Sequence, residues 1–300
     1  MKKGLFSTIF LGVLAGLLAS VPAFAQGYRI DVTLNGLKDT TCILGHYNYS
    51  NQQFLAKDTA RVDGRGHLVF EDSKALPGGL YLILLPGNRR WVEMVYSGKE
   101  TNFSLSTDTT NIVKNMMVKG SEENRLFYEY QQQLAQIMQE AEAASLEKKV
   151  KNDPASTALA DKKMQEAQQK FNSYRKKFIA DNAGTFTTKL LKASFDPEIP
   201  EAPVLPNGRQ DSTWVFNYYK AHYWDNFDFS DERLLRAPFI KPKLERYIKE
   251  LVVQTPDSLI KDADALIKKA AANKELKSYI VYYITSEYEN TKVVGTEGVF

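Results

Sequence analysis

The sequence predicts an α+β protein in which a small antiparallel β-sandwich is followed by an all-helical domain with a long helical hairpin. Three observations predict this fold class. Apolar residues alternate with polar ones in short stretches up to about residue 120, they recur every three or four positions after it, and a proline-rich stretch at 196–208 interrupts the second pattern. We therefore expect a cleaved leader at 1–25, a β-sandwich-like domain at 26–120 and a helical domain at 121–300.

The first 25 residues have the pattern of a secretory signal peptide. Two lysines precede an apolar run at 5–18, and residues 21–25 (VPAFA) place small residues where a signal peptidase cleaves. The apolar run is too short for a membrane-spanning helix. We therefore expect an exported protein that begins at Gln26, has no transmembrane segment after cleavage, and resides in the periplasm or cell envelope.

Short strands are predicted throughout the β-rich domain. An alternating stretch that begins at Tyr28 ends in Asn35-Gly36, and the stretch 57–62 turns at Asp63-Gly64 into the stretch 67–70. Asn-Gly and Asp-Gly favour tight turns between antiparallel strands, so two hairpins are predicted. Further strands are predicted at 80–85, 91–95 and 102–105. Roughly seven short strands at this spacing favour an antiparallel sandwich.

The helical domain opens with two long amphipathic helices. Ser121 is a favourable N-cap, and apolar residues then recur every three or four positions up to Ala141. After Asn152-Asp153-Pro154 the pattern resumes and runs from Ala160 to Phe178. The short break predicts an antiparallel helical hairpin whose two seams pack on each other. The alternative is that the hairpin serves as an interaction or spacer element.

Further helices are predicted after the proline-rich loop. Asp211-Ser212 is a cap for a helix with an aromatic stripe that ends at Tyr223. An apolar stripe at 244–252, the cap-and-proline pair Thr255-Pro256 and a second stripe at 276–288 predict the remaining helices.

Charge and cysteine content exclude several classes of function. The chain has 39 Lys and Arg against 36 Asp and Glu, and because the two signs are interspersed, the basic patch of a nucleic-acid-binding protein is missing. The single cysteine, Cys42, can form neither an internal disulfide nor a CxxC pair. Because Cys42 lies in a predicted strand, we expect a small buried residue, with a reactive or intermolecular thiol as the alternative.

The segment from 222 to 235 (HYWDNFDFSDERLL) is the strongest candidate for a functional site, since it combines four aromatic residues with four acids. As part of a core, the aromatic residues would pack a turn onto neighbouring helices, which is the favoured interpretation. As a site, they would form a platform for a sugar or a peptide, with acids as polar partners. The candidate ligand or partner surface consists of Trp224, Phe227, Asp228 and Asp231.

No sequence pattern predicts a catalytic residue, a cofactor or a metal. The aspartates of this segment are spaced three residues apart, unlike those of a calcium-binding loop. His46, His67 and His222 lie in separate segments without the spacing of a zinc site. Nucleophile elbows, phosphate loops and dinucleotide fingerprints do not occur in the sequence. A protein without enzymatic activity is predicted, and a hydrolase whose site no motif reveals stays an alternative.

Four stretches, together with the signal-peptide pattern and the order of the two domains, carry a resemblance to a known family. They are Asp58-Thr-Ala-Arg-Val-Asp-Gly64, Gly78-Gly-Leu-Tyr81, Val118-Lys-Gly-Ser-Glu-Glu-Asn124 and Trp224-Asp-Asn-Phe-Asp-Phe-Ser-Asp231. This combination resembles the N-terminal part of Bacteroidetes thiol-disulfide oxidoreductases. In those proteins two domains of unknown function, one β-rich and one helical, precede a thioredoxin-like domain of the TlpA/ResA or AhpC/TSA type.

The resemblance implies a non-catalytic, exported accessory module. The family's reactive CxxC motif does not occur in this sequence, so no catalytic residue is carried over, and Cys42 matches none. The implied role is to orient a redox domain or to present a surface to a partner, which would be a thioredoxin-like domain or another envelope protein. The alternative function is that of an independent periplasmic protein that binds a peptide or a glycan through the Trp224 segment.

The final residues predict the start of another helix. Thr296 is a favourable cap, and Val299 and Phe300 would be the first apolar residues of a buried stripe. One turn cannot offset the cost of helix nucleation. We therefore expect the helical domain to be truncated at its C-terminal end, before the redox domain that the resemblance implies.

Overall fold

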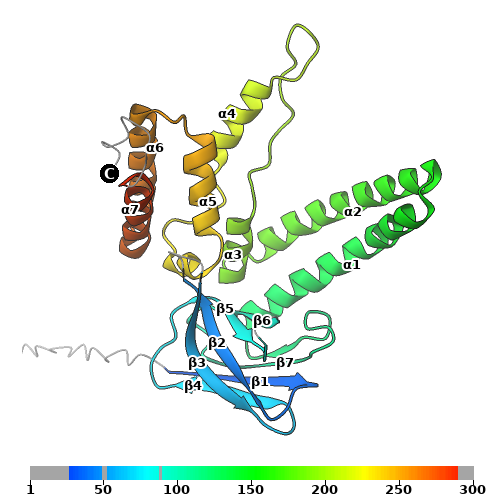
Figure 1. Cartoon of the computed structure of the whole chain (residues 1–300), viewed down its shortest axis with the longest axis vertical. Coiled ribbons are helices and arrows are strands. Elements are labelled where there is room, and N and C mark those ends of the chain that lie inside the picture. Colours follow the sequence, from blue (N-terminus) through cyan, green and yellow to red (C-terminus); the bar gives the residue numbers. More distant parts are fainter. Residues whose placement is uncertain (1–26, 49–52, 88–89, 290–300) are drawn as a thin grey trace, which may run out of the picture.

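The computed structural model describes residues 27–48, 53–87 and 90–289. Within these ranges, eight strands come first in the chain. The helices follow them, as the colours along the chain in Figure 1 show. The predicted α+β class, with a sandwich before a helical domain, is confirmed. The predicted signal peptide and the predicted start of a C-terminal helix lie outside the described residues.

The strands form two four-stranded sheets, with the strand orders β4-β1-β7-β8 and β3-β2-β5-β6. The first sheet consists of β1 (Tyr28–Asn35), β4 (His67–Asp72), β7 (Asn102–Asp108) and β8 (Met117–Lys119). The second consists of β2 (Thr40–Tyr47), β3 (Phe54–Val62), β5 (Gly79–Leu84) and β6 (Trp91–Tyr96). Side chains of both sheets contribute to one hydrophobic core, as in a sandwich.

Two connections differ from the sequence prediction. The sequence predicts hairpins at Asn35-Gly36 and Asp63-Gly64, but each turn carries the chain from one sheet to the other. β1 pairs with β4 instead, in a register that places Ile30 opposite Phe70. The reason is that turn residues fix a local reversal, whereas the partner of a strand depends on which apolar face has to be buried. β1 also pairs in parallel with β7, an exception to the antiparallel pairing of the other named strands.

Cys42 on β2 is fully buried in the sandwich. Burial raises the pKa of its thiol to about 11, because the charged thiolate is disfavoured away from water. The thiol is therefore protonated at neutral pH and is sheltered by the core. The prediction of a small buried residue is confirmed.

Helices α1 (Glu122–Lys151) and α2 (Pro154–Asp181) form a long antiparallel hairpin, here called the arm, that projects away from the sandwich (Figure 1). The cap of α1 is the predicted Ser121, and Asp153, which the sequence analysis places in the break between the two helices, caps α2. The Ser121 side chain accepts a hydrogen bond from the N–H of Asn124, and the Asp153 side chain accepts one from the N–H of Ser156. At 1.5 Å per residue, α1 is about 45 Å long.

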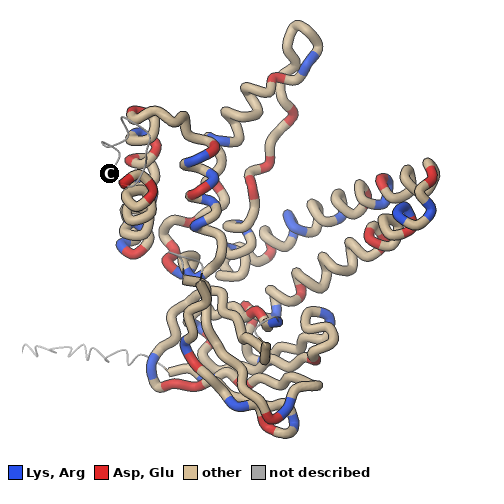
Figure 2. Tube along the Cα trace, in the orientation of Figure 1, with Lys and Arg blue, Asp and Glu red and all other residues tan. Residues whose placement is uncertain are grey.

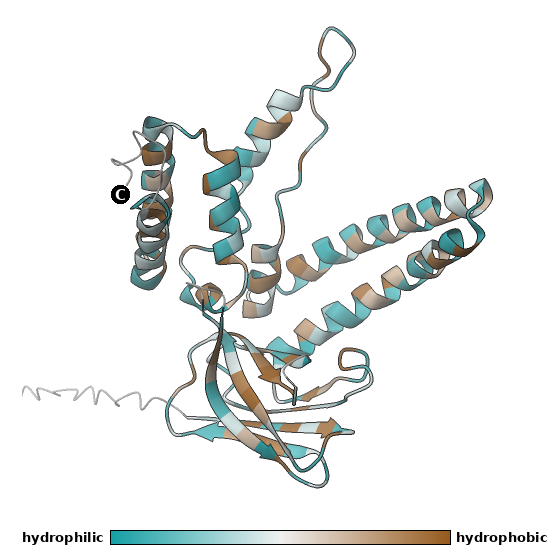
Figure 3. Ribbon diagram, viewed as in Figure 1, coloured by the Kyte–Doolittle hydropathy of each residue, from teal (hydrophilic) through white to brown (hydrophobic). Residues whose placement is uncertain are grey.

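A seam of small residues lies inside the arm, with a polar surface around it. Ala141 and Ala144 of α1 and Ala160 and Ala167 of α2 are buried. Hydrophilic and hydrophobic residues alternate along the ribbons of α1 and α2 in Figure 3, and basic and acidic residues are interspersed along both helices in Figure 2. None of the described helices is both long enough and apolar enough to cross a membrane.

Shorter helices complete the helical domain. They are α3 (Phe186–Ser194), α4 (Ser212–His222), the 3-10 helix η1 (Glu232–Arg236), α5 (Ile240–Arg246), the π-helix η2 (Tyr247–Leu251), α6 (Pro256–Lys269) and α7 (Lys274–Glu289). Asp211 caps α4 as predicted, by accepting hydrogen bonds from two N–H groups of its first turn. Helix α3 is not among the predicted helices, although Thr185 is a favourable N-cap and is followed by apolar residues one turn apart.

The two domains share one hydrophobic core. It continues from both sheets through α3 and the segment 223–237 to α7. A smaller cluster, formed by Leu126, Tyr130 and Phe178, holds the base of the arm together. The β-rich and helical domains are therefore packed against each other, whereas linked independent domains would each have a separate core.

Candidate functional site at the joint between the domains

Trp224 and Phe227 belong to the hydrophobic core. Each residue is 5% exposed, and the two rings meet edge to face at a centroid distance of 5.8 Å. Phe229 and Tyr247 also pack against the Trp224 indole, at 5.3 and 5.5 Å. The predicted packing of these residues in a core is confirmed. Their rings are packed against other aromatic side chains, which does not favour the alternative assignment to a ligand or partner surface.

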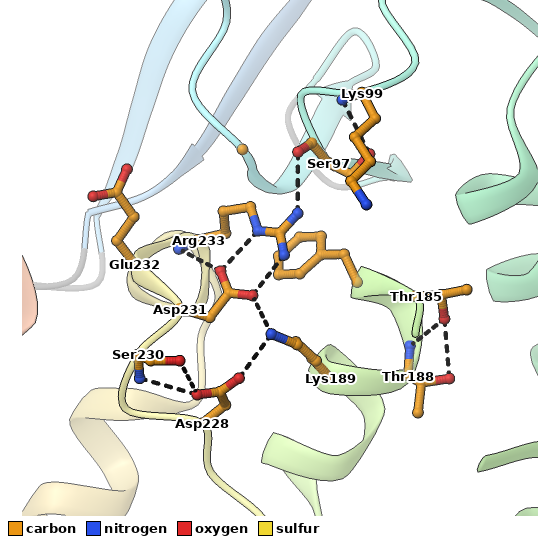
Figure 4. A network of polar contacts seen from close by, with 12 residues as sticks. Ser97, Lys99, Thr185, Thr188, Lys189, Asp228, Ser230, Asp231, Glu232 and Arg233 are labelled. Atoms are coloured by element: carbon orange, nitrogen blue, oxygen red, sulfur yellow. Dashed lines mark hydrogen bonds and ion pairs between the residues drawn. The ribbon is translucent and has the colours of Figure 1, made fainter. Parts of the chain in front are cut away.

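Asp228 and Asp231 point from the turn before η1 toward two cations (Figure 4). Nζ of Lys189, on α3, lies 2.7 Å from Asp228 Oδ2 and 3.1 Å from Asp231 Oδ2. Arg233 donates to Asp231 through Nε at 2.7 Å and through Nη2 at 2.6 Å. The two acids that the sequence offers as polar partners of a ligand are therefore paired with cations of the protein itself.

Helix η1 connects this network to the sandwich. Arg233 Nη1 donates to the carbonyl of Ser97 at 3.1 Å, and its guanidinium lies 4.1 Å from the ring centroid of Phe186 on α3. Arg236 donates to the carbonyl of Gly78 at 3.3 Å and pairs with Glu275 of α7 at 3.1 Å. We call this region, where the sandwich meets α1, α3, η1 and α7, the joint.

Gly78 and Gly79 leave room for the two arginines. A Cβ atom at Gly78 would lie 2.5 Å from Cδ of Arg233, and one at Gly79 would lie 2.5 Å from Cβ of Arg236. Both distances are far shorter than van der Waals contact between carbon atoms. A side chain at either glycine would push η1 away from β5, so the glycine pair permits the close approach of the two domains.

Two carboxylates of the joint, Asp228 and Asp231, are held in their charged form. Burial by itself raises the pKa of Asp228, but Lys189 and Ser230 outweigh it and lower the pKa to about 2. Burial also opposes ionisation of Asp231, and hydrogen bonds from Arg233 and Lys189 hold its pKa below the usual value. Such groups are suited to permanent pairing, whereas proton transfer near neutral pH requires a pKa close to 7.

Two polar side chains fasten the start of α1 to the sandwich. Glu100 accepts hydrogen bonds from Ser121 Oγ at 2.6 Å and from the N–H of Glu122 at 2.8 Å. The fully buried Asn124 pairs with both the N–H and the carbonyl of Val95, each at 2.8 Å. Because β6 is an edge strand of its sheet, Asn124 supplies partners that no neighbouring strand provides.

Glu123 connects α1 to α3. Its carboxylate accepts hydrogen bonds from the N–H of Phe186 at 2.9 Å and from the N–H of Thr187 at 2.7 Å. The first N–H groups of a helix have no partner within the helix, and its dipole favours a negative charge there. The stretch 118–124, which carries part of the sequence resemblance, thus joins α1 to both β6 and α3.

The three histidines occupy separate places. His46 is buried on β2 and donates through Nδ1 to the carbonyl of Tyr47, whereas His67 and His222 pair with nearby aspartates. Among the described residues, no group of three or more histidine, cysteine, aspartate or glutamate side chains is placed to hold a metal ion.

A cleft of about 870 Å³ lies beside the joint. His46 and Leu55 of the sandwich, Glu232 of η1 and Tyr282 of α7 contribute to its walls. Burial lowers the pKa of His46, so that its imidazole is neutral at pH 7. Because the walls come from both domains, the joint sets the shape of this cleft.

Several residues of the joint are missing from the site that the sequence predicts. They are Glu123, Asn124, Lys189, Arg233 and Arg236. For Glu123 and Asn124, the sequence offered one signal, because both lie in the stretch 118–124 that carries part of the resemblance. Lys189 lies 42 positions before Asp231, and no local spacing indicates that these two side chains pair.

Comparisons with known proteins find two family models along the chain. A domain of unknown function (DUF4369) matches residues 28–127, and another domain of unknown function (DUF5106) matches residues 156–300. No curated protein and no solved structure matches the chain. The chain is thus similar to two domains of unknown function, one over the sandwich and the start of α1 and one over most of the helical domain.

Proposed function

We propose that the protein is a non-catalytic, exported accessory module of a cell-envelope thiol-disulfide oxidoreductase, and that it presents an interaction surface to a thioredoxin-like domain or another envelope protein. The observation that supports a presenting role is the joint, in which Asn124 and Arg233 of the helical domain bind backbone groups of the sandwich. The connection to oxidoreductases rests on the sequence resemblance. The envelope location rests on the signal-peptide pattern.

The polar contacts of the joint oppose motion between the domains. Relative motion is the usual expectation for two domains with a small polar interface. Here Asn124 and Arg233 of the helical domain bind backbone groups of Val95 and Ser97 in the sandwich. Separating the domains would exchange these hydrogen bonds for bonds to water, at a net cost of about 0.5–1.5 kcal/mol for each, and would expose part of the shared core. A fixed orientation is useful when a partner contacts both domains at once.

The joint sets the position of two surfaces, the arm and the 870 Å³ cleft. The far part of α1 exposes Leu146 (63%) and Val150 (85%), which lie one turn apart and therefore on the same side of the helix. The cleft lies between the sandwich and α7. We expect the partner to contact both the arm and the cleft, because the joint fixes the distance between these two surfaces.

The structure does not favour the alternatives. A peptide- or glycan-binding platform at Trp224 requires accessible ring faces, but Trp224 and Phe227 are buried. A reaction of Cys42 requires an accessible thiolate, but this thiol is buried and its pKa is raised.

Binding to thioredoxin-like domains tests the proposal. Residues 26–300 would be titrated by calorimetry with each exported thioredoxin-like domain that the same genome encodes, and we expect a complex with at least one. Asp231→Asn is expected to weaken it by loosening the joint. Asp225→Asn, which alters an exposed acid of the same segment, is the matched control and should leave the Kd unchanged. Failure of every domain to bind would contradict the proposed partner.

An insulin-reduction assay tests the non-catalytic character. The protein alone is expected to leave the rate of insulin reduction by dithiothreitol unchanged, since exchange requires an attacking thiolate and a second thiol. An acceleration that Cys42→Ser abolishes would show that the chain is itself a catalyst.

A further inference from the structure

A second cleft, of about 520 Å³, is lined by residues of β6, of α1 and of the stretch 109–113. Trp91 and Glu93 of β6, Tyr128 and Gln131 of α1 and Arg90 line it. We call it the Trp91 cleft. Its volume falls in the range of about 300–1,000 Å³ that is typical of sites for small ligands.

The Trp91 cleft opens where α1 stops covering the sheet edge. Asn124 pairs with Val95, and one turn later the hydroxyl of Tyr128 donates to the carbonyl of Glu93 at 2.7 Å. The next side chain on this side of α1 is Gln131. Its Nε2 is buried and has no hydrogen-bond partner among the described residues. The series of contacts between α1 and β6 thus ends in an unsatisfied donor.

Polar and aromatic groups converge in this cleft. Trp91 and Glu93 lie two positions apart on β6 and therefore on the same face, and Trp91 remains 42% exposed. Burial raises the pKa of Glu93, and the nearby Trp91 and Gln131 side chains only partly offset this. The Gln131 side chain is near enough to lower the pKa of Glu93, but its Nε2 has no partner that meets hydrogen-bond geometry among the described residues. At the rim, Arg90 donates to the carbonyl of Thr109 at 2.7 Å.

We propose that the Trp91 cleft binds a pyranose unit of a neutral glycan. The exposed indole of Trp91 offers a flat apolar face to the C–H groups of the sugar ring. The carboxyl of Glu93 and the amide of Gln131 offer an acceptor and a donor to neighbouring hydroxyls, and the amide can turn about its soft terminal torsion. A hydroxyl bound to Gln131 Nε2 removes the cost of an unsatisfied buried donor.

The chemistry of the cleft favours a neutral sugar over an ion or a peptide. An anion would meet the carboxyl of Glu93, and a cation would meet the guanidinium of Arg90. An extended peptide binds most readily as an added strand at a free sheet edge. That mode is blocked here, because Asn124 and Tyr128 occupy the edge of β6.

Calorimetric titration with soluble oligosaccharides tests the proposal. The probes are maltohexaose, cellohexaose, xylohexaose and chitotetraose, with a neutral Ala/Ser hexapeptide as the competing class. We expect at least one oligosaccharide to bind, and Trp91→Ala and Gln131→Ala each to weaken binding by roughly tenfold or more, since an aromatic anchor and its polar partner dominate such contacts. Trp214→Ala, which alters a tryptophan on α4 outside the cleft, is the control and should leave binding unchanged.

Glu93→Gln keeps the shape of the side chain and tests the carboxyl separately. It is expected to weaken binding while the thermal unfolding temperature stays near that of the parent, which separates a ligand contact from a folding defect. Three outcomes would overturn the proposal: no oligosaccharide binds, binding survives Trp91→Ala, or the peptide binds in place of the sugars.

Discussion

Replacement of Asn124 by alanine perturbs the joint at its most buried polar contact. The residue is 0% exposed, and its amide bonds the N–H and the carbonyl of Val95, each at 2.8 Å, and Ser121 Oγ at 2.9 Å. Alanine would leave both backbone groups of Val95, itself 1% exposed, without these partners. At about 1–3 kcal/mol for each buried unpaired group, the free energy of unfolding should fall by roughly 2–6 kcal/mol.

Urea denaturation followed by circular dichroism would measure this loss. Asn172→Ala is the matched control, because Asn172 accepts its hydrogen bond from Gln168 on the outer surface of the arm. The control should lose less than about 0.5 kcal/mol, as is usual for surface substitutions. Equal losses in the two variants would refute the reasoning, since the backbone groups of Val95 would then have found other partners.

Three further outcomes are expected. Trp224→Ala should lower the free energy of unfolding by about 3–5 kcal/mol through a core cavity, and a loss in denaturant titrations no larger than that of Trp214→Ala would contradict its place in the core. Asp228→Asn should destabilise the protein at pH 7 but not near pH 2. The pKa of Asp228 is about 2 in the folded protein and about 3.9 in the unfolded chain. The pairing with Lys189 therefore stabilises the folded state above about pH 4, and this stabilisation is lost as the pH falls through the folded pKa. Thermal melts across this range check it, and a difference between the two proteins that does not vary with pH would count against the pairing. Cys42 should react with Ellman's reagent only after unfolding, because its thiol is buried and the pKa of this thiol is about 11. Rapid labelling of the native protein would show that the sandwich does not enclose Cys42.

Local signals in the sequence were sufficient for the fold class and for the ends of the long helices. The predicted caps at Ser121 and Asp211 act on N–H groups two or three positions away, so a short stretch contains all the information. Strand pairing is different, because the turn at Asn35-Gly36 specifies a reversal and leaves the partner strand open. The transfer of the chain between sheets and the parallel pairing of β1 with β7 depend on the whole core.

The candidate site was predictable only in part. Burial of Trp224 was predicted from the aromatic residues around it, although the preceding helix α4, whose aromatic stripe was expected to be buried, contains no buried residue. The pairing of Asp231 with Lys189 joins residues 42 positions apart, and lysines and acids occur throughout the chain, so composition and spacing do not single out this pair. The Trp91 cleft is likewise hidden in the sequence, because its lining comes from β6, the stretch 109–113 and α1, and no local spacing indicates that these segments meet.

The central claim is that the joint holds the sandwich and the helical domain in one orientation. Spin labels at Arg61→Cys on β3 and Lys261→Cys on α6, both exposed positions, would report the distance between the domains by pulsed electron paramagnetic resonance, while the buried Cys42 stays unlabelled. The account predicts one narrow distance distribution, which Arg233→Ala broadens by removing the contacts to Asp231 and Ser97. A broad distribution with the joint intact would contradict it.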